Sequence, residues 1–297
     1  MNALWAKLNP KLLNIALKVG VFVFLAIVGL FLFGGLLSVF GYLVASALSV
    51  FAAAGVANAL AMRIWEDGSL IGIGFPWNAA AIRNLLLGLA GGIGSALAVL
   101  LGPVVESAAE LQRVSGQGDW TSVLFVLTLL VFGAIGEEML FHGYAFQVLM
   151  GALGPFATIL PVSVLFAAMH SGNMNVTPLA LVNTALWGIV FGFAFWRSGD
   201  LWLPIGLHLG WNWMLPLFGV NLSGFTMNVT GYVMRWRPGH EWLSGGAYGP
   251  EASPLTSAVL VVLFLWLVWK APVRRQTPYL LRDRWDEIGG PEEPVKE

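Results

Sequence analysis

Long uncharged stretches alternate with short polar intervals along this chain. The runs 19–62, 84–105 and 121–136 contain no Asp, Glu, Lys or Arg, and neither does 139–196. A helix that crosses a bilayer needs about 20 consecutive, mostly apolar residues. The pattern therefore predicts a protein that crosses a membrane several times as helices.

The number of these runs predicts about eight transmembrane helices. The first run is long enough for two helices, with a break at Gly34-Gly35 or at Gly41, since glycine favours breaks between helices. The other spans are expected at about 84–105, 121–150, 156–170, 178–196, 203–218 and 254–269. The fold class expected is thus all-α, a polytopic membrane helical bundle.

The chain shows no internal repeat and no sign of a second domain. We expect a single transmembrane helical domain over 1–270, followed by a charged cytoplasmic tail over 271–297.

Composition supports this class and limits the partners. Hydrophobic residues make up 58% of the chain and charged residues 10%, against about 25% in soluble domains. The mean hydropathy is +0.78 and the net charge is −1, which argues against nucleic acid as a partner. Cysteine is absent, which excludes disulfides and thiolate metal sites. The partners expected are membrane lipids and a peptide or membrane-protein substrate.

The positive charges predict an orientation. With eight spans, both termini lie on one side of the membrane. Of the 15 Lys and Arg residues, all except Arg113, Arg235 and Arg237 lie on that side. Positive charge concentrates on the cytoplasmic side of membrane proteins. We therefore expect cytoplasmic termini and, as the most natural location, the cytoplasmic (inner) membrane.

Two adjacent carboxylates, Glu137 and Glu138, interrupt the apolar pattern. One charge at the centre of a membrane helix costs roughly 2.5–3.5 kcal/mol on insertion scales. Such residues persist where they pair, bind an ion or take part in chemistry. Three histidines, His142, His170 and His208, also lie in or beside apolar runs, and Glu with His in a dry site points to proton transfer or metal binding.

Helical spacing sorts these residues by face. Glu138 lies four residues before His142, and His208 four before Asn212, so each pair shares a helix face. Glu137 lies roughly 100° around the helix from Glu138. If Glu137 faces a cavity, Glu138 is therefore expected to hold His142 or a neighbouring helix.

Three motifs in this order resemble the CPBP family of intramembrane proteases, which includes the CAAX-processing endoproteases and bacterial relatives sometimes called the Abi family. The resemblance covers about 123–215 and rests on Gly136-Glu-Glu-Met-Leu-Phe-His-Gly-Tyr144, Val164-Leu-Phe-Ala-Ala-Met-His170 and Arg197-Ser-Gly-Asp-Leu-Trp-Leu-Pro-Ile-Gly-Leu-His208, with Asn212 one turn later. The family's first motif usually ends in Arg, where this chain has His142.

The resemblance and the residue types together predict an endopeptidase. Glu137 is the candidate general base for a water molecule, with Glu138 beside it as a further catalytic candidate. His170 would orient the same water, and His208 and Asn212 would donate to the oxyanion. Alternatively, Glu137, His170 and His208 would bind zinc, as in two-His-plus-Glu metalloproteases.

Two other classes remain open at this point. A noncatalytic membrane partner, for example an immunity-type protein on the same fold, would tolerate the change at His142. A proton-coupled transporter would also use buried Glu and His, although such carriers often show internal repeats. Without the other motifs, His208 and Asn212 would be interpreted as interhelical hydrogen-bonding groups.

Overall fold

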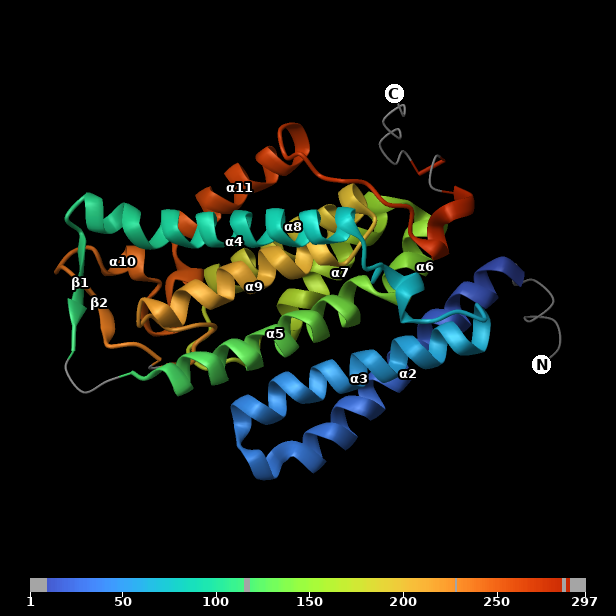
Figure 1. Ribbon diagram of the computed structural model, residues 1–297, viewed down its shortest axis with the longest axis horizontal. Helices are drawn as coiled ribbons and strands as arrows, with labels where there is room; N and C mark the ends of the chain where they lie inside the picture. The colour runs from blue at the N-terminus through green and yellow to red at the C-terminus, as the bar shows by residue number, and fades with distance from the viewer. Residues whose placement is uncertain (1–9, 115–117, 228, 285–286, 289–297) are drawn as a thin grey trace.

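The computed structural model describes residues 10–114, 118–227, 229–284 and 287–288. Its main elements are the helices α2 (Pro10–Leu37), α3 (Tyr42–Trp65), α4 (Ala79–Val105), α5 (Trp120–His142), α6 (Tyr144–Leu153), α7 (Pro155–Met169), α8 (Pro178–Ser198), α9 (Trp202–Leu217), α10 (Glu241–Ser244) and α11 (Pro254–Trp269), and the strands β1 (Ala109–Arg113) and β2 (Tyr232–Trp236). The expected all-α class is confirmed (Figure 1).

Among the residues that the structure describes, five apolar segments are long enough to cross a membrane. They are Pro10–Phe40, Tyr42–Trp65, Ala79–Val105, Trp120–Leu153 and Pro178–Ser198. The helices α7 and α11 are apolar but shorter, and α9 has 16 residues. The protein is therefore an integral membrane protein. Within the described residues a helix lies at each of the eight expected spans, although α7, α9 and α11 are shorter than the five segments above.

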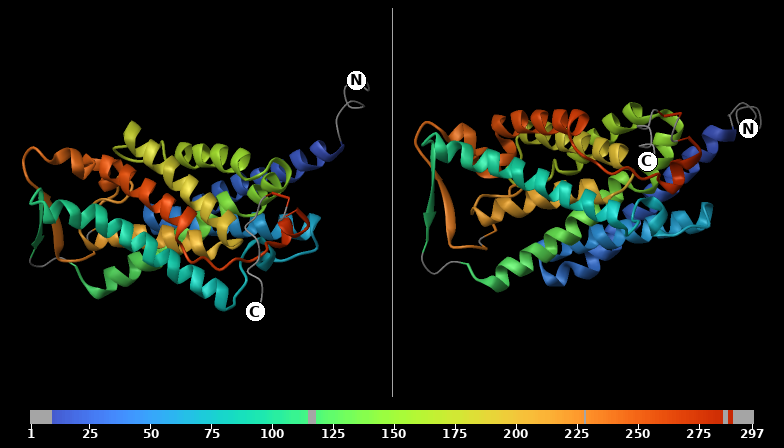
Figure 2. Two further views of the ribbon diagram at one scale, coloured as in Figure 1. Left: turned by 90° about the horizontal axis from the view of Figure 1, so that it is seen from above. Right: turned by 45° about the horizontal axis from the view of Figure 1, so that its top comes forward.

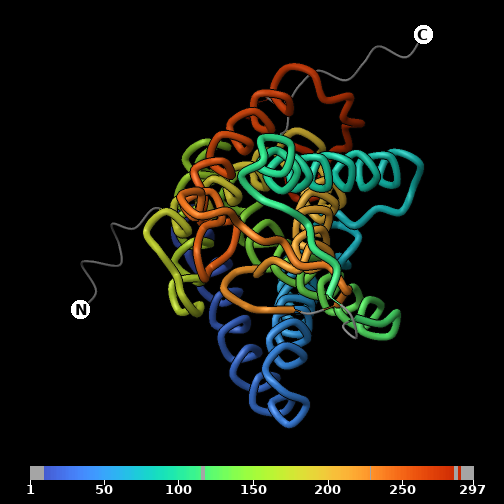
Figure 3. Tube along the Cα trace, turned by 90° about the vertical axis from the view of Figure 1, so that its left-hand side faces the viewer, coloured from blue at the N-terminus to red at the C-terminus, as the bar shows by residue number. Residues whose placement is uncertain are grey.

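The break in the first apolar run falls at Gly41, one of the two expected positions. Gly41 has a φ of 88°, a left-handed backbone conformation that glycine adopts without steric cost. The resulting α2–α3 hairpin packs on α5 and α6. Figure 3 shows this hairpin projecting on one side of the molecule, with α4 and α11 on the other.

The expected span 121–150 is divided in the structure, because α5 ends at His142 and α6 begins at Tyr144. Asn58 of α3 stabilises this break. Its Nδ2 donates to the carbonyl of Met139 at 3.0 Å, and its Oδ1 accepts from the N–H of Tyr144 at 2.8 Å. A Cβ at Gly143 would lie 2.4 Å from Asn58 Oδ1, so glycine is required at this contact.

The α4–α9 pair forms the most extensive helix contact of the bundle. A Cβ on Gly88 or Gly92 of α4 would lie 2.2–2.3 Å from backbone atoms of α9, and one on Gly206 or Gly210 would meet α4 in the same way. Small residues let membrane helices approach closely. This close packing fixes the position of His208 on α9.

The strands β1 and β2 form an antiparallel ribbon that hydropathy did not predict. Ala109 pairs with Trp236, and Arg113 with Tyr232. The ribbon lies at the end of the bundle opposite the start of α2 and the segment Tyr279–Arg284 (Figures 1 and 2). Both described ends of the chain thus lie at the same end of the bundle.

The segment that follows α11 packs back on the helices. The N–H of Arg274 donates to Asn84 Oδ1 at 2.9 Å, and Gln276 Nε2 donates to Asp200 Oδ2 at 2.7 Å. These contacts join the segment to α4 and to the loop between α8 and α9.

Candidate active site

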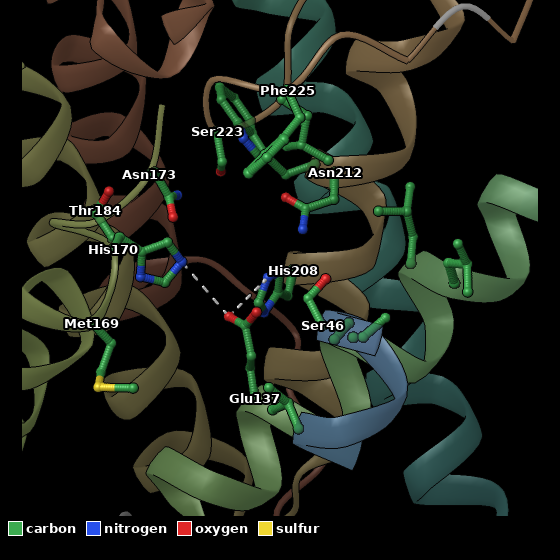
Figure 4. A pocket seen from close by; sticks show the side chains of 18 of the residues that line it. Ser46, Glu137, Met169, His170, Asn173, Thr184, His208, Asn212, Ser223 and Phe225 are labelled. Atoms are coloured by element: carbon green, nitrogen blue, oxygen red, sulfur yellow. Dashed lines mark ion pairs between the residues drawn. The ribbon is translucent and has the colours of Figure 1, made fainter. Parts of the chain in front are cut away.

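A cavity of about 300 Å³ lies between α3, α5, α7, α8, α9 and the segment 222–227. Glu137 projects into it from α5, His170 from the end of α7, and His208 and Asn212 from α9 (Figure 4). The structure thus brings four of the five predicted catalytic residues to one cavity. The apolar lining comes mainly from α3 and α5.

Both histidines approach the same carboxylate oxygen. Nε2 of His170 and Nε2 of His208 each lie 3.9 Å from Oε2 of Glu137 (Figure 4). This oxygen is buried and accepts no hydrogen bond from any described group, although the Glu137 side chain is 27% exposed. A polar separation of this size is one that a single water molecule bridges.

The other nitrogen of each ring fixes which atom faces Glu137. Nδ1 of His170 lies 2.8 Å from the carbonyl oxygen of Phe166, so Nδ1–H donates to this acceptor. Nδ1 of His208 lies 2.9 Å from Oε1 of Glu138 and donates in the same way. A neutral ring held like this presents the lone pair of Nε2 to the cavity.

Glu138 lies behind His208 and does not line the cavity. It is fully buried, and its Oε1 binds His208 while its Oε2 accepts from His142 Nδ1 at 2.7 Å. The spacing argument expected Glu138 to hold either His142 or a neighbouring helix, and it does both. Glu138 therefore orients His208, and the His142 that replaces the usual Arg still reaches it.

Aromatic rings lock the two cavity histidines. Phe191 stacks on His208 with centroids 4.8 Å apart, and Phe166 contacts both His170 and His208. Phe166 thus orients His170 twice, through its ring and through its carbonyl. The Phe-x-x-x-His motif places both contacts within one helical turn.

A second carboxylate that lines the cavity, Glu251, was not predicted from the sequence. Its Oε1 accepts from Trp211 Nε1 at 3.3 Å, and its Oε2 accepts from the N–H of Ser223 and from Ser223 Oγ, the latter at 3.1 Å. Burial raises the pKa of Glu251 above its ordinary value, although these donors oppose the shift. Glu251 precedes α11 in a polar segment that hydropathy treats as a loop, so no local pattern distinguishes it.

A bound zinc ion limits the distances between its ligands. Ligands at 2.0–2.2 Å around a tetrahedral ion lie about 3.4 Å from one another. Glu137 Oε2 is 3.9 Å from each Nε2, and the described residues include no group of three or more His, Asp or Glu placed to hold a metal. Glu137, His170 and His208 in this arrangement do not fit the ion, and zinc binding stays a prediction.

A helical membrane bundle with a buried Glu–His cluster open to a cavity defines the class: an integral membrane protein with an intramembrane polar site. The description "Type II CAAX prenyl endopeptidase Rce1-like" belongs to a family model that matches residues 119–214. The chain belongs to this Rce1-like family of CAAX-type proteases, as its motifs predicted. The match includes Glu137, Glu138, His170, His208 and Asn212.

An Escherichia coli protein described as an "Uncharacterized 24.3 kDa protein" is 30% identical to this chain over 158 residues. The similarity covers 51% of this chain and 67% of that relative.

Proposed function

We propose that the protein is an intramembrane endopeptidase in which Glu137 activates the water that attacks a peptide bond. One observation carries this proposal: a buried carboxylate oxygen without a described protein donor, flanked by two Nε2 atoms at 3.9 Å, in a cavity. A structural carboxylate in a membrane protein would instead be fully hydrogen-bonded.

The first step is attack of water on the scissile carbonyl. Glu137 takes one proton from the water, and His170, through Nε2, orients the same molecule. The apolar lining from α3 and α5 limits the access of bulk water to the reacting groups.

The second step is collapse of the tetrahedral intermediate. Asn212 donates from its amide to the oxyanion, a contribution of about 2.7–4 kcal/mol for one such donor. His208 donates as well if it takes up a proton at Nε2, and Glu138 stabilises that charge through Nδ1. Glu137 then gives its proton to the leaving amine, and the peptide bond is broken.

The contact between His142 and Glu138 favours an active enzyme over a noncatalytic partner. His142 keeps a 2.7 Å hydrogen bond to Glu138 at the position of the family's Arg, and Glu138 in turn holds His208 of the cavity, so the substitution leaves this chain of contacts intact. The substrate class proposed is a peptide or membrane protein whose scissile bond reaches the cavity.

Cleavage of a diverse peptide library by the detergent-purified protein tests this proposal. Glu137→Gln should show no cleavage while its circular dichroism and elution volume match the unmodified protein. Glu106→Gln, at an exposed position after α4, is the matched control and should cleave normally.

Elemental analysis and chelator treatment of the same samples test the zinc prediction. Stoichiometric zinc with activity lost on chelation would replace the water-only mechanism.

We also propose cytoplasmic termini. Because the chain lacks cysteine, single cysteines can be labelled without background. In intact cells a membrane-impermeant maleimide should label Gln112→Cys in β1 and leave Asp283→Cys unlabelled. The reverse pattern would overturn this orientation.

A further inference from the structure

Glu251 is a buried carboxylate of the cavity that the proposed hydrolysis does not use. It lies in the short turn Pro250–Ala252, immediately before α11, and is 9% exposed. It lines the same cavity as Glu137, His170 and His208. The Glu251 carboxylate is held between Trp211 of α9 and Ser223, and it therefore borders the cavity that a substrate would enter.

The chain holds Glu251 rigidly. Asn183 Nδ2 donates to the carbonyls of Glu251 and Ser253, at 2.7 and 3.0 Å, and Ser257 Oγ donates to Asn183 Oδ1 at 2.6 Å. Thr256 Oγ1 donates to the carbonyl of Pro250 at 2.6 Å. The turn is therefore fixed to α8 and α11, and the carboxylate is a built feature of the cavity wall.

Acidic groups outnumber permanent cations around this space. Glu137 and Glu251 line the cavity, Glu138 lies behind it, and no Lys or Arg is among the described lining residues. His170 and His208 interact with Glu251 electrostatically, but their Nε2 atoms face Glu137. A low-dielectric cavity of this composition attracts a positive charge supplied by the ligand.

We infer that Glu251 is a specificity-determining residue that binds a positively charged group of the substrate, a lysine or arginine side chain close to the scissile bond. This inference rests on the proposed function. Asn173 and Ser223, which also line this part of the cavity, supply further acceptors for an ammonium or guanidinium group. The apolar wall from α3 and α5 receives the uncharged part of the substrate.

A peptide series tests this subsite on the unmodified protein. A peptide that the library shows to be cleaved is prepared with lysine, acetyl-lysine, norleucine or glutamate at each position around the bond, with the amino terminus free or acetylated. One position should favour lysine over acetyl-lysine and norleucine by roughly 10- to 100-fold in kcat/KM, as charge-assisted hydrogen bonds typically contribute. Equal rates at every position would overturn the inference and leave the proposed hydrolysis intact. No cleavage of any peptide would instead contradict the proposed function.

The variant Glu251→Gln keeps the size and one acceptor oxygen but removes the charge. The ratio of kcat/KM for lysine over norleucine should fall toward one, mostly through KM. Glu241→Gln, an exposed position in the same segment, should keep the ratio.

A preference for lysine that survives in Glu251→Gln would show that Glu251 only connects Ser223 to Trp211 and does not bind the substrate. A preference that disappears on acetylating the amino terminus would assign the charge to the terminus, and would overturn the side-chain assignment. If Glu251→Gln does not fold, the peptide series on the unmodified protein still decides.

Discussion

Asp200 and Glu137 are both acidic residues in an apolar protein, yet their surroundings differ. Asp200 Oδ1 accepts from the N–H groups of Trp202 and Leu203 at 3.0 and 3.1 Å, and Oδ2 accepts from Asn84 Nδ2 and Gln276 Nε2, both at 2.7 Å. Glu137 Oε2 accepts from no described group and faces a cavity. The first carboxylate joins α4, the start of α9 and the segment after α11, and the second is available for chemistry.

Glu138 lies between these extremes. Both of its oxygens are hydrogen-bonded, like those of Asp200, but its partners are imidazoles and one of them lines the cavity. For these three carboxylates, the hydrogen-bond donors together with access to the cavity separate structural, positioning and reacting roles better than burial does. The following predictions test that order of roles.

Glu137→Gln should have the largest effect on activity. A glutamine cannot accept the proton of the attacking water, and general-base contributions are typically about 10²- to 10⁴-fold in rate. Turnover by the purified variant should fall by that factor while substrate affinity, measured by competition, is retained. An activity loss below tenfold would remove Glu137 from the reaction.

Glu138→Gln should reduce kcat by roughly 10- to 100-fold, because both imidazole partners lose a charged acceptor and one of them faces the amide NH2 group instead. His208 would then be free to rotate away from Glu137. The measurement is kcat across pH, since a positioning role changes the profile, whereas simple misfolding lowers all points together. An unchanged profile with full activity would contradict the role.

His142→Gln should have a smaller effect, about tenfold or less. Gln can still donate to Glu138 Oε2, and His142 has no contact with the cavity. Single-turnover cleavage rates compare this variant with Glu137→Gln. Equal losses in the two variants would make His142 a direct participant.

Asp200→Asn should leave activity per folded molecule unchanged and lower stability by about 1–3 kcal/mol, because an amide group would face the donors of Asn84 and Gln276. Burial raises the pKa of Asp200 above its ordinary value of 3.8, against the four hydrogen bonds that lower it. The folded state therefore favours the protonated form.

The sign of the pH dependence follows from that shift. The contribution of Asp200 is fully present below the unfolded pKa and is lost as the pH rises through the folded pKa. The stability gap between the unmodified protein and Asp200→Asn should shrink as the pH rises above the ordinary pKa of 3.8. Thermal unfolding in detergent measures it, and a gap that widens with pH would contradict the raised pKa.

The sequence predicted much of the bundle because membrane helices are defined by local apolar length. The break at Gly41 was among the expected positions, whereas the break at Gly143 was not. The second depends on Asn58, 85 positions away, and no periodicity in α5 indicates that contact.

The residues of the candidate site also divide into those that the sequence indicated and one that it did not. Glu137, Glu138, His170, His208 and Asn212 were selected because charged and polar residues in apolar helices are conspicuous, and the roles given to them stay predictions. Glu251 escaped because acidic residues in polar segments are common. Glu251 reaches the cavity through tertiary contacts, the hydrogen bonds that Trp211 and Ser223 donate to its carboxylate.

The most direct test follows peptide cleavage and internal pH together in liposomes that contain either the unmodified protein or Glu137→Gln. The unmodified protein should cleave the peptide without net proton movement across the membrane. Glu137→Gln should neither cleave the peptide nor move protons. Proton flux without cleavage in the unmodified protein would contradict the hydrolase and favour a carrier.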